Sequence, residues 1–233
     1  MNPGRASRYV VGSGERCIIL VYDIHGFAPA NTQHNCDLLA DAGEFLVVMP
    51  DFFRGSGRGQ EGFERPDSDV VDAELADIVL PFAKSKGAKS LGMLGFCFGG
   101  AVAMRASTTD AFAAVGGIHA GGVTDELAGA ATVPVMLLQA GNDPDLASVA
   151  EILGGKDLGA KCVLRQFWDR SHGWCGGTGD RAGDPELRAA VEDAMDTSIK
   201  SGAHQRRLAW ASLTGVLLRA GSSTGTSDAA VHK

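Results

Sequence analysis

Six short apolar runs recur along the chain and are separated by segments with helical spacing. The runs are rich in Val, Ile, Leu and Ala and nearly continuous, which is typical of parallel strands covered on both faces. They occupy residues 17–22, 45–49, 91–94, 112–118, 133–139 and 162–167. Helices are expected over residues 31–42, 67–84, 98–106, 146–153 and 185–200. This alternation predicts an α/β fold with a mostly parallel central sheet and helices on both faces.

Three further segments complete the predicted organisation. Residues 54–66 are polar and rich in glycine, and we expect a long loop beside the functional site. Apolar positions with helical spacing over residues 205–219 predict a last helix that packs back on the domain. Residues 221–233 have the composition of a linker. We therefore expect one domain over residues 1–220, followed by a flexible tail over residues 221–233.

Composition excludes several classes of protein. The 233 residues carry a formal net charge of −7, and no basic stripe is visible that would bind nucleic acid or an anionic membrane surface. The apolar runs are too short to span a bilayer, and the first residues lack the apolar segment of a secretory signal. Five scattered cysteines without a CxxC motif indicate free thiols in a reducing compartment. A cytoplasmic protein is expected, and its oligomeric state stays open.

The strongest candidate for chemistry is the segment GFCFGG at residues 95–100, between an apolar strand and a helix. It has the G-x-nucleophile-x-G pattern of a nucleophile elbow, with Cys97 in the position of the usual serine. The small flanking residues let the chain turn sharply, and the start of the helix favours a thiolate at the sulfur. The alternative interpretation is a buried structural cysteine in a glycine-rich turn.

Two later residues could complete a catalytic triad with Cys97. Asp143 follows the run at 133–139, and His172 follows the run at 162–167, which gives the order nucleophile, acid, histidine. In a Cys–His–Asp triad, His172 would exchange a proton with Cys97, and Asp143 would orient the imidazole. Asp145, in the same turn as Asp143, is the alternative acid.

An oxyanion hole requires two backbone N–H donors near the nucleophile. The N–H of Phe98 follows Cys97 and supplies one donor, and the N–H of Ile24, after the first apolar run, could supply the second. Asp23 would then lie near the sulfur. The equally weighted alternative is that Asp23 is only a polar residue that ends a strand.

These residues resemble the dienelactone hydrolases, also called carboxymethylenebutenolidases, which have the α/β-hydrolase fold. The matching segments are DIHG at 23–26, PDFFRG at 50–55, GFCFGG at 95–100, Asp143, and SHG at 171–173. The resemblance implies an ester or lactone hydrolase that acts on a small molecule without a cofactor. It gives Cys97, Asp143 and His172 the triad roles, and Ile24 and Phe98 the oxyanion hole. It also implies that an acidic residue at position 23 governs the resting state of the thiol.

The chain departs from this family where the substrate would bind. His25 stands where an apolar residue is common. Well-known members hold a substrate carboxylate with two arginines, but Arg54 comes one residue early for the first, and Gly176 occupies the place of the second. His25 and Arg54 stay candidate substrate-binding residues. We therefore expect a preference for neutral or weakly polar esters and lactones.

Other functions and other notable residues have weaker support. A non-catalytic member of the fold that binds a small molecule or a protein, or a thioesterase or acyl transferase, would share much of this pattern. His172 and Cys175 could form a pair of metal ligands, but two ligands do not make a zinc site, so no metal or cofactor is expected. His119 ends an apolar run and could face the site or a turn, and Trp174 could line the site or pack within the domain.

Overall fold

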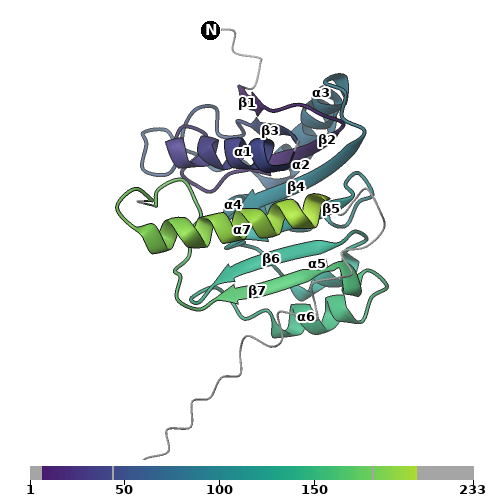
Figure 1. Ribbon diagram of the computed structural model, residues 1–233. Coiled ribbons are helices and arrows are strands. Elements are labelled where there is room, and N and C mark those ends of the chain that lie inside the picture. The colour runs from purple at the N-terminus through teal and green to yellow at the C-terminus, as the bar shows by residue number, and fades with distance from the viewer. Residues whose placement is uncertain (1–6, 44, 180, 204–233) are drawn as a thin grey trace, which may run out of the picture.

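A seven-stranded sheet forms the centre of the computed structural model, which describes residues 7–43, 45–179 and 181–203. The sheet has the order β1-β3-β2-β4-β5-β6-β7, and every neighbouring pair is parallel except β1 with β3. The strands are β1 (Arg8–Val11), β2 (Arg16–Val21), β3 (Leu46–Pro50), β4 (Ser90–Phe96), β5 (Ala114–Ile118), β6 (Val135–Ala140) and β7 (Val163–Phe167) (Figure 1). Strands β2 to β7 confirm the six predicted strands and the α/β class.

Strand β1 was not predicted. It has only four residues and pairs antiparallel with β3 at an edge of the sheet, where its side chains are at most partly buried. Because an edge strand of this length needs no continuous apolar run, its sequence carries little signal.

Helices cover both faces of the sheet. They are α1 (Ala30–Gly43), α2 (Ser68–Glu74), α3 (Leu80–Ser85), α4 (Phe98–Ala106), α5 (Asp125–Ala130), α6 (Ala147–Gly154) and α7 (Pro185–Ala203). Helices α1 and α7 contact each other over one face, whereas α4 packs against β4 and β5 and contacts α2 and α5 (Figure 1). The hydrophobic core lies between these layers.

The single helix predicted over residues 67–84 is interrupted. A π-helical segment, Leu75–Val79, separates α2 from α3, and Pro81 stands in the first turn of α3. Because proline has no N–H to donate, it removes one hydrogen bond of a continuous α-helix at this point. Asp67 stands at the N-cap of α2, but its side chain makes no capping hydrogen bond. The short helix α5, capped by the Thr124 hydroxyl, was not predicted.

Other predictions fall on loops or outside the described residues. Residues 54–66 contain turns and bends but neither helix nor strand, as expected. The predicted helix over residues 205–219 and the tail over residues 221–233 lie outside the described residues, so the domain boundary stays a prediction. Among the helices that the structure describes, none combines the length and the apolar character needed to cross a membrane.

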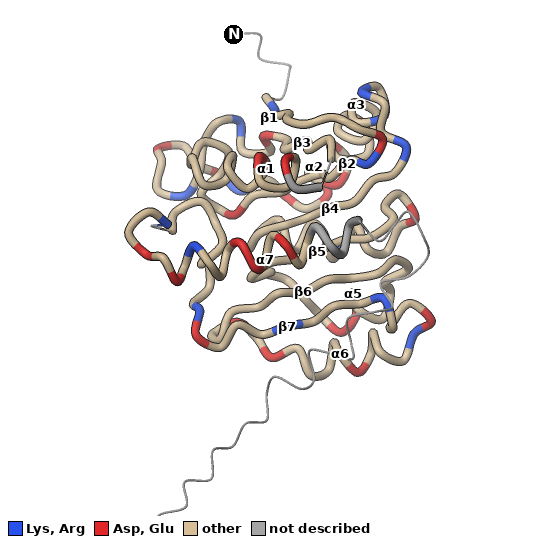
Figure 2. Tube along the Cα trace, viewed as in Figure 1, with Lys and Arg blue, Asp and Glu red and all other residues tan. Residues whose placement is uncertain are grey.

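The fold brings the chemistry-bearing residues to one edge of the sheet. Charged side chains lie mainly on loops and helices, and strands β3 to β6 contain none (Figure 2). Asp23, Cys97, Asp143 and His172 each follow one of the parallel strands β2, β4, β6 and β7. Because the carboxyl ends of parallel strands meet at the same edge, residues 149 positions apart can share one site.

Candidate active site

Cys97 occupies a sharp turn between β4 and α4. Its backbone has φ 49° and ψ −104°, a conformation that few residues other than glycine adopt. A Cβ atom on Gly95 would lie 1.9 Å from the carbonyl oxygen of Gly99, and one on Gly99 would lie 2.1 Å from that of Val21. The glycines of the elbow pattern are therefore required by packing, and the predicted turn is present.

The structure places His172 between Cys97 and Asp143. Nε2 of His172 lies 3.1 Å from Sγ of Cys97, and Nδ1 lies 2.5 Å from Oδ1 of Asp143. The second carboxylate oxygen of Asp143 accepts the N–H of Ala140 at 2.7 Å, which fixes the orientation of the carboxylate. The three residues predicted to meet are thus within hydrogen-bonding distance, in the geometry of a nucleophile, a base and an orienting acid.

Asp145 makes a different contact. Its Oδ1 accepts the N–H of Ala147 at 2.9 Å at the start of α6, and the residue is exposed. The structure therefore brings Asp143, and not Asp145, to the imidazole. Asn142 was missed by the sequence analysis, although its Oδ1 accepts the backbone N–H of His172 at 2.7 Å and so holds the histidine loop to the β6 turn.

The groups around Cys97 shift the pKa of its thiol in opposite directions. Burial, followed by the negative charge of Asp23, raises the pKa of the Cys97 thiol, whereas the N–H groups of Phe98 and Ile24 lower it. The two N–H groups predicted for an oxyanion hole therefore face the sulfur. The expected stabilisation of a thiolate is present but is outweighed, because the pKa lies above its ordinary value. A protonated thiol needs a base when it attacks.

Asp23 joins two loops of the site. It is 4% exposed, and its two carboxylate oxygens accept the N–H groups of His25 at 2.8 Å and Gly177 at 2.9 Å. A Cβ atom on Gly176 would lie 2.1 Å from Oδ2 of Asp23, so this position must be glycine. Asp23 is therefore more than a polar residue at a strand end, because it ties the loop after β2 to the loop after His172.

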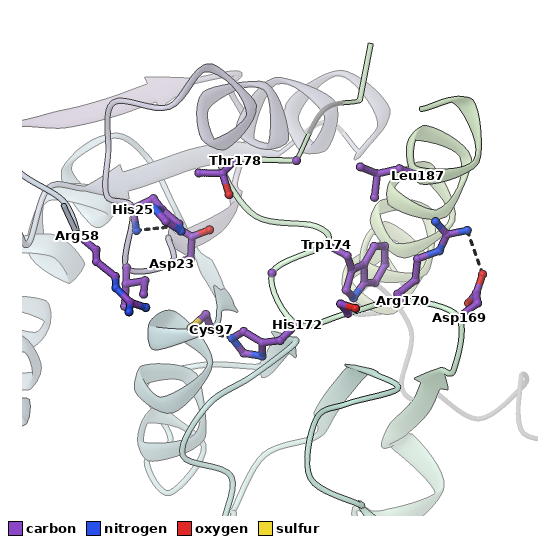
Figure 3. Close-up of a pocket in the computed structure, with 14 residues that line it drawn as sticks. Asp23, His25, Arg58, Cys97, Asp169, Arg170, His172, Trp174, Thr178 and Leu187 are labelled. Atoms are coloured by element: carbon purple, nitrogen blue, oxygen red, sulfur yellow. Dashed lines mark hydrogen bonds and ion pairs between the residues drawn. The ribbon is translucent and has the colours of Figure 1, made fainter. Parts of the chain in front are cut away.

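A cavity of about 690 Å³ opens above the sulfur. Figure 3 shows His25 and Arg58 on one side of Cys97 and His172, and Trp174, Arg170 and Leu187 on the other. Its remaining lining residues are Asp23, Ile24, Asp169, Ser171, Gly173, Thr178 and Gly179. Trp174 also packs on Phe167, with ring centroids 4.7 Å apart, so it both lines the site and packs within the domain. The cavity is large enough for a small-molecule substrate.

Arg54 does not line this cavity, which corrects its place among the candidate substrate-binding residues. Its guanidinium forms two hydrogen bonds to the carboxylate of Glu74, at 3.0 and 2.7 Å, and lies over a separate surface depression. The backbone of Arg54 is left-handed, with φ 56°, and this conformation helps to direct the side chain toward Glu74.

Arg58, four residues later, enters the cavity instead. Its backbone N–H donates to the carbonyl of Ile24 at 2.8 Å, and Gly57 packs directly on the carbonyl of His25. Among the described residues, no carboxylate pairs with the Arg58 guanidinium. The sequence analysis missed this residue, although the expected loop over residues 54–66 contained it.

Four buried cysteines and the buried Arg181 do not line the cavity. Cys17, Cys36, Cys162 and Cys175 are free and buried, whereas Cys97 is partly exposed. Burial raises the pKa of the Cys175 thiol to about 12, and Arg181 hydrogen-bonds the carbonyls of Cys175 and Gly176. In the described part of the chain, no three His, Cys, Asp or Glu side chains gather as metal ligands.

A cysteine in a strained turn between a parallel strand and a helix, with a histidine and an acid from the ends of later strands beside it, is the arrangement typical of the α/β-hydrolase fold. The sequence profile of the Dienelactone hydrolase family matches residues 9–200. The chain therefore belongs to the dienelactone hydrolase family, as the resemblance of its motifs predicted.

Curated proteins are similar to parts of this chain. A carboxymethylenebutenolidase homolog of Rattus norvegicus is 30% identical over 104 residues, which cover 40% of this chain and 42% of that protein. An endo-1,3;1,4-beta-D-glucanase of Zea mays is 31% identical over 147 residues, which cover 60% of this chain and 48% of that protein. The chain thus spans about half the length, or less, of these curated relatives.

Solved structures share the fold. The dienelactone hydrolase from Anabaena variabilis aligns with a TM-score of 0.54 at 14% identity, over 84% of this chain and 91% of that one. Est1E from Butyrivibrio proteoclasticus, solved with ferulic acid, aligns with a TM-score of 0.61 at 14% identity, over 84% of this chain and 95% of that one. These similarities confirm the predicted α/β-hydrolase fold.

Proposed function

We propose that this protein hydrolyses an ester or lactone of a small molecule through a covalent acyl-enzyme on Cys97. The observation that carries the proposal is the position of His172, whose two ring nitrogens lie 3.1 Å from the Cys97 sulfur and 2.5 Å from the Asp143 carboxylate. Membership of the dienelactone hydrolase family supports the same reaction class.

In the first half of the reaction, the Cys97 sulfur attacks the carbonyl carbon of the substrate while Nε2 of His172 accepts the thiol proton. The carbonyl π electrons move to the oxygen, which becomes an oxyanion. The N–H groups of Phe98 and Ile24, which already face the sulfur, donate to this oxygen. The oxyanion then collapses, the C–O bond to the alcohol breaks, and His172 returns its proton to the leaving oxygen.

In the second half, water replaces the alcohol. His172 takes a proton from the water as its oxygen attacks the thioester carbon, and a second oxyanion forms in the same place. Collapse breaks the C–S bond, releases the carboxylic acid, and returns a proton to the sulfur. Asp143 stabilises the imidazolium in both halves because its carboxylate is 2.5 Å from Nδ1.

Trapping the acyl-enzyme tests this proposal directly. With a panel of activated esters, lactones and thioesters, we expect an acyl mass added to the peptide that contains Cys97. Activated esters should also give a burst of alcohol release equal to the enzyme concentration where hydrolysis of the acyl-enzyme is the slow step. Hydrolysis of thioesters alone would favour the thioesterase alternative. Binding without any turnover or acyl adduct would contradict the proposal and favour a non-catalytic member of the fold.

The charge preference of the cavity follows from Arg58 and replaces the expectation based on Arg54. Arg58 is exposed and presents an unpaired cation beside Cys97, so we expect anionic esters to be favoured over neutral ones. An exposed charge contributes about 0.2–1 kcal/mol, so Arg58→Ala should raise KM for a substrate carboxylate by about 1.5- to 5-fold. KM for the corresponding methyl ester should stay unchanged.

Arg54→Ala is the matched control, because it removes an arginine from the same loop whose guanidinium is held by Glu74. It should leave the ratio of kcat/KM for acid and methyl ester unchanged. A ratio that falls in Arg54→Ala and not in Arg58→Ala would restore Arg54 as the candidate that binds a substrate carboxylate.

We further propose that the protein lies in a reducing compartment, the cytoplasm. The five free cysteines agree with this location, because thiols stay reduced there.

A further inference from the structure

His119, which the proposed mechanism does not use, lies directly against His172. It follows β5, is fully buried, and its ring centroid is 5.1 Å from that of His172 with an angle of 69° between the ring planes. Within the described part of the chain, neither ring nitrogen of His119 has a hydrogen-bond partner from another residue. Burying a polar ring without partners costs free energy, so its place beside the reacting histidine calls for a reason.

The backbone around His119 is held firmly to the elbow. The N–H of His119 donates to the carbonyl of Leu138 at 2.7 Å, and the N–H of Gly121 donates to the carbonyl of Cys97 at 2.9 Å. The side chain of Gln139 accepts the N–H of Ala120 at 2.6 Å and donates to its carbonyl at 3.1 Å. The backbone of residues 119–121 is therefore held in a fixed position relative to the turn at Cys97.

The His119 ring is also uncharged. Burial, with a smaller effect of His172, lowers the pKa of His119 to about 3. Its other ring neighbour is Phe96, at 5.9 Å between centroids, so His172 is the one titratable ring that it contacts among the described residues. A neutral ring at this place allows His172 to accept a proton without repulsion from a second imidazolium.

His172 has few other restraints. Its side chain is 40% exposed, and it contacts the Cys97 sulfur, the Asp143 carboxylate and the ring of His119. Hydrogen bonds at its two nitrogens still permit the imidazole to tilt about the line between them, whereas an adjoining ring blocks this tilt on one side.

We propose that His119 is a positioning residue whose uncharged ring holds the His172 imidazole in line with Cys97. The proposal rests on the proposed function, because it assigns His172 the role of the base. This role depends on the shape of the His119 ring and on its lack of charge, and the ring nitrogens transfer no proton.

Two substitutions separate the ring from the backbone conformation. His119 has φ 39°, which asparagine tolerates and phenylalanine tolerates less well. His119→Asn keeps the backbone and loses the ring, whereas His119→Phe keeps an uncharged ring. We expect His119→Asn to lower kcat by about 10- to 100-fold with little change in KM, because misplacement of a reacting group lowers the rate by such factors. His119→Phe should stay within about 3-fold of the parent protein.

The second readout is the pH dependence of Cys97 alkylation, which does not require turnover. If His172 is misplaced in His119→Asn, the alkylation profile should match that of a His172→Ala variant, whereas His119→Phe should keep the profile of the parent protein. Leu153→Ala, a buried truncation in α6 remote from the site, is the control for lost stability and should leave the profile unchanged. This profile distinguishes misplacement from general destabilisation.

Two results would overturn the proposal. The first is a folded His119→Asn protein with the parent kcat and alkylation profile. The second is a folded His119→Phe protein as impaired as His119→Asn, because the imidazole nitrogens would then carry the role. Either result leaves the covalent mechanism intact, since that mechanism fails only if the parent protein forms no acyl-enzyme on Cys97.

Discussion

Replacing Cys97 with alanine is expected to lower kcat for ester hydrolysis by more than about 10³-fold, since loss of the nucleophile of a triad has effects of this size or larger. Alanine leaves the oxyanion donors and the cavity in place, so substrate binding should persist. The measurement is kcat and Kd for one activated ester in both proteins. A Cys97→Ala variant with the parent kcat would refute covalent catalysis by this thiol.

Cys175→Ala is the matched control for this prediction. Cys175 is a second thiol near the histidine loop, but it is fully buried and does not line the cavity, so its loss should leave kcat nearly unchanged. Alkylation gives an independent measurement. Because the other four cysteines are buried, one equivalent of iodoacetamide should react at Cys97. The rate should keep rising with pH above the ordinary range of a thiol, because burial and Asp23 raise the Cys97 pKa.

Local patterns made most of the fold and part of the site predictable. Strands β2 to β6 are apolar and buried almost throughout, so their sequences carry a strong signal, whereas the edge strand β7 is mostly half-buried. The turn at Cys97 was predictable because it requires glycine at positions 95 and 99. Backbone atoms lie within about 2 Å of the place that a Cβ atom would take there, so no other residue fits. Chain order then limited the partners of Cys97 to residues at the ends of later strands.

Features that depend on distant contacts were not predictable. Arg54 and Arg58 look equivalent in sequence, and only the packing of residues 56–58 against residues 24–26 directs Arg58 toward the sulfur. The pairing of Arg54 with Glu74, twenty residues away, is likewise a property of the folded chain. The neutral state of His119 results from burial that no local pattern reveals. Candidate substrate-binding residues are therefore harder to predict than the proposed triad, because no motif marks them and their positions depend on contacts between distant loops.

Replacing Asp143 with asparagine is expected to lower kcat by about 10⁴-fold, the effect of the corresponding change in a serine triad. The structure gives a specific reason. The N–H of Ala140 donates to Oδ2 of Asp143, so the amide oxygen of asparagine should occupy that place and turn its NH₂ group toward Nδ1 of His172. Nδ1 would then accept a hydrogen bond, and the ring proton would move to Nε2. A protonated Nε2 cannot take the proton of Cys97.

Asp145→Asn distinguishes this mechanism from a general effect of lost charge. Asp145 lies two residues away, and its Oδ1 accepts the N–H of Ala147, a bond that the amide oxygen of asparagine can keep. This variant should therefore retain kcat within about 2-fold. Rate measurements on both variants with one ester decide the assignment. If Asp145→Asn were the more impaired variant, Asp145 would be the acid that orients His172, and the contact between Asp143 and the imidazole would have only a structural role.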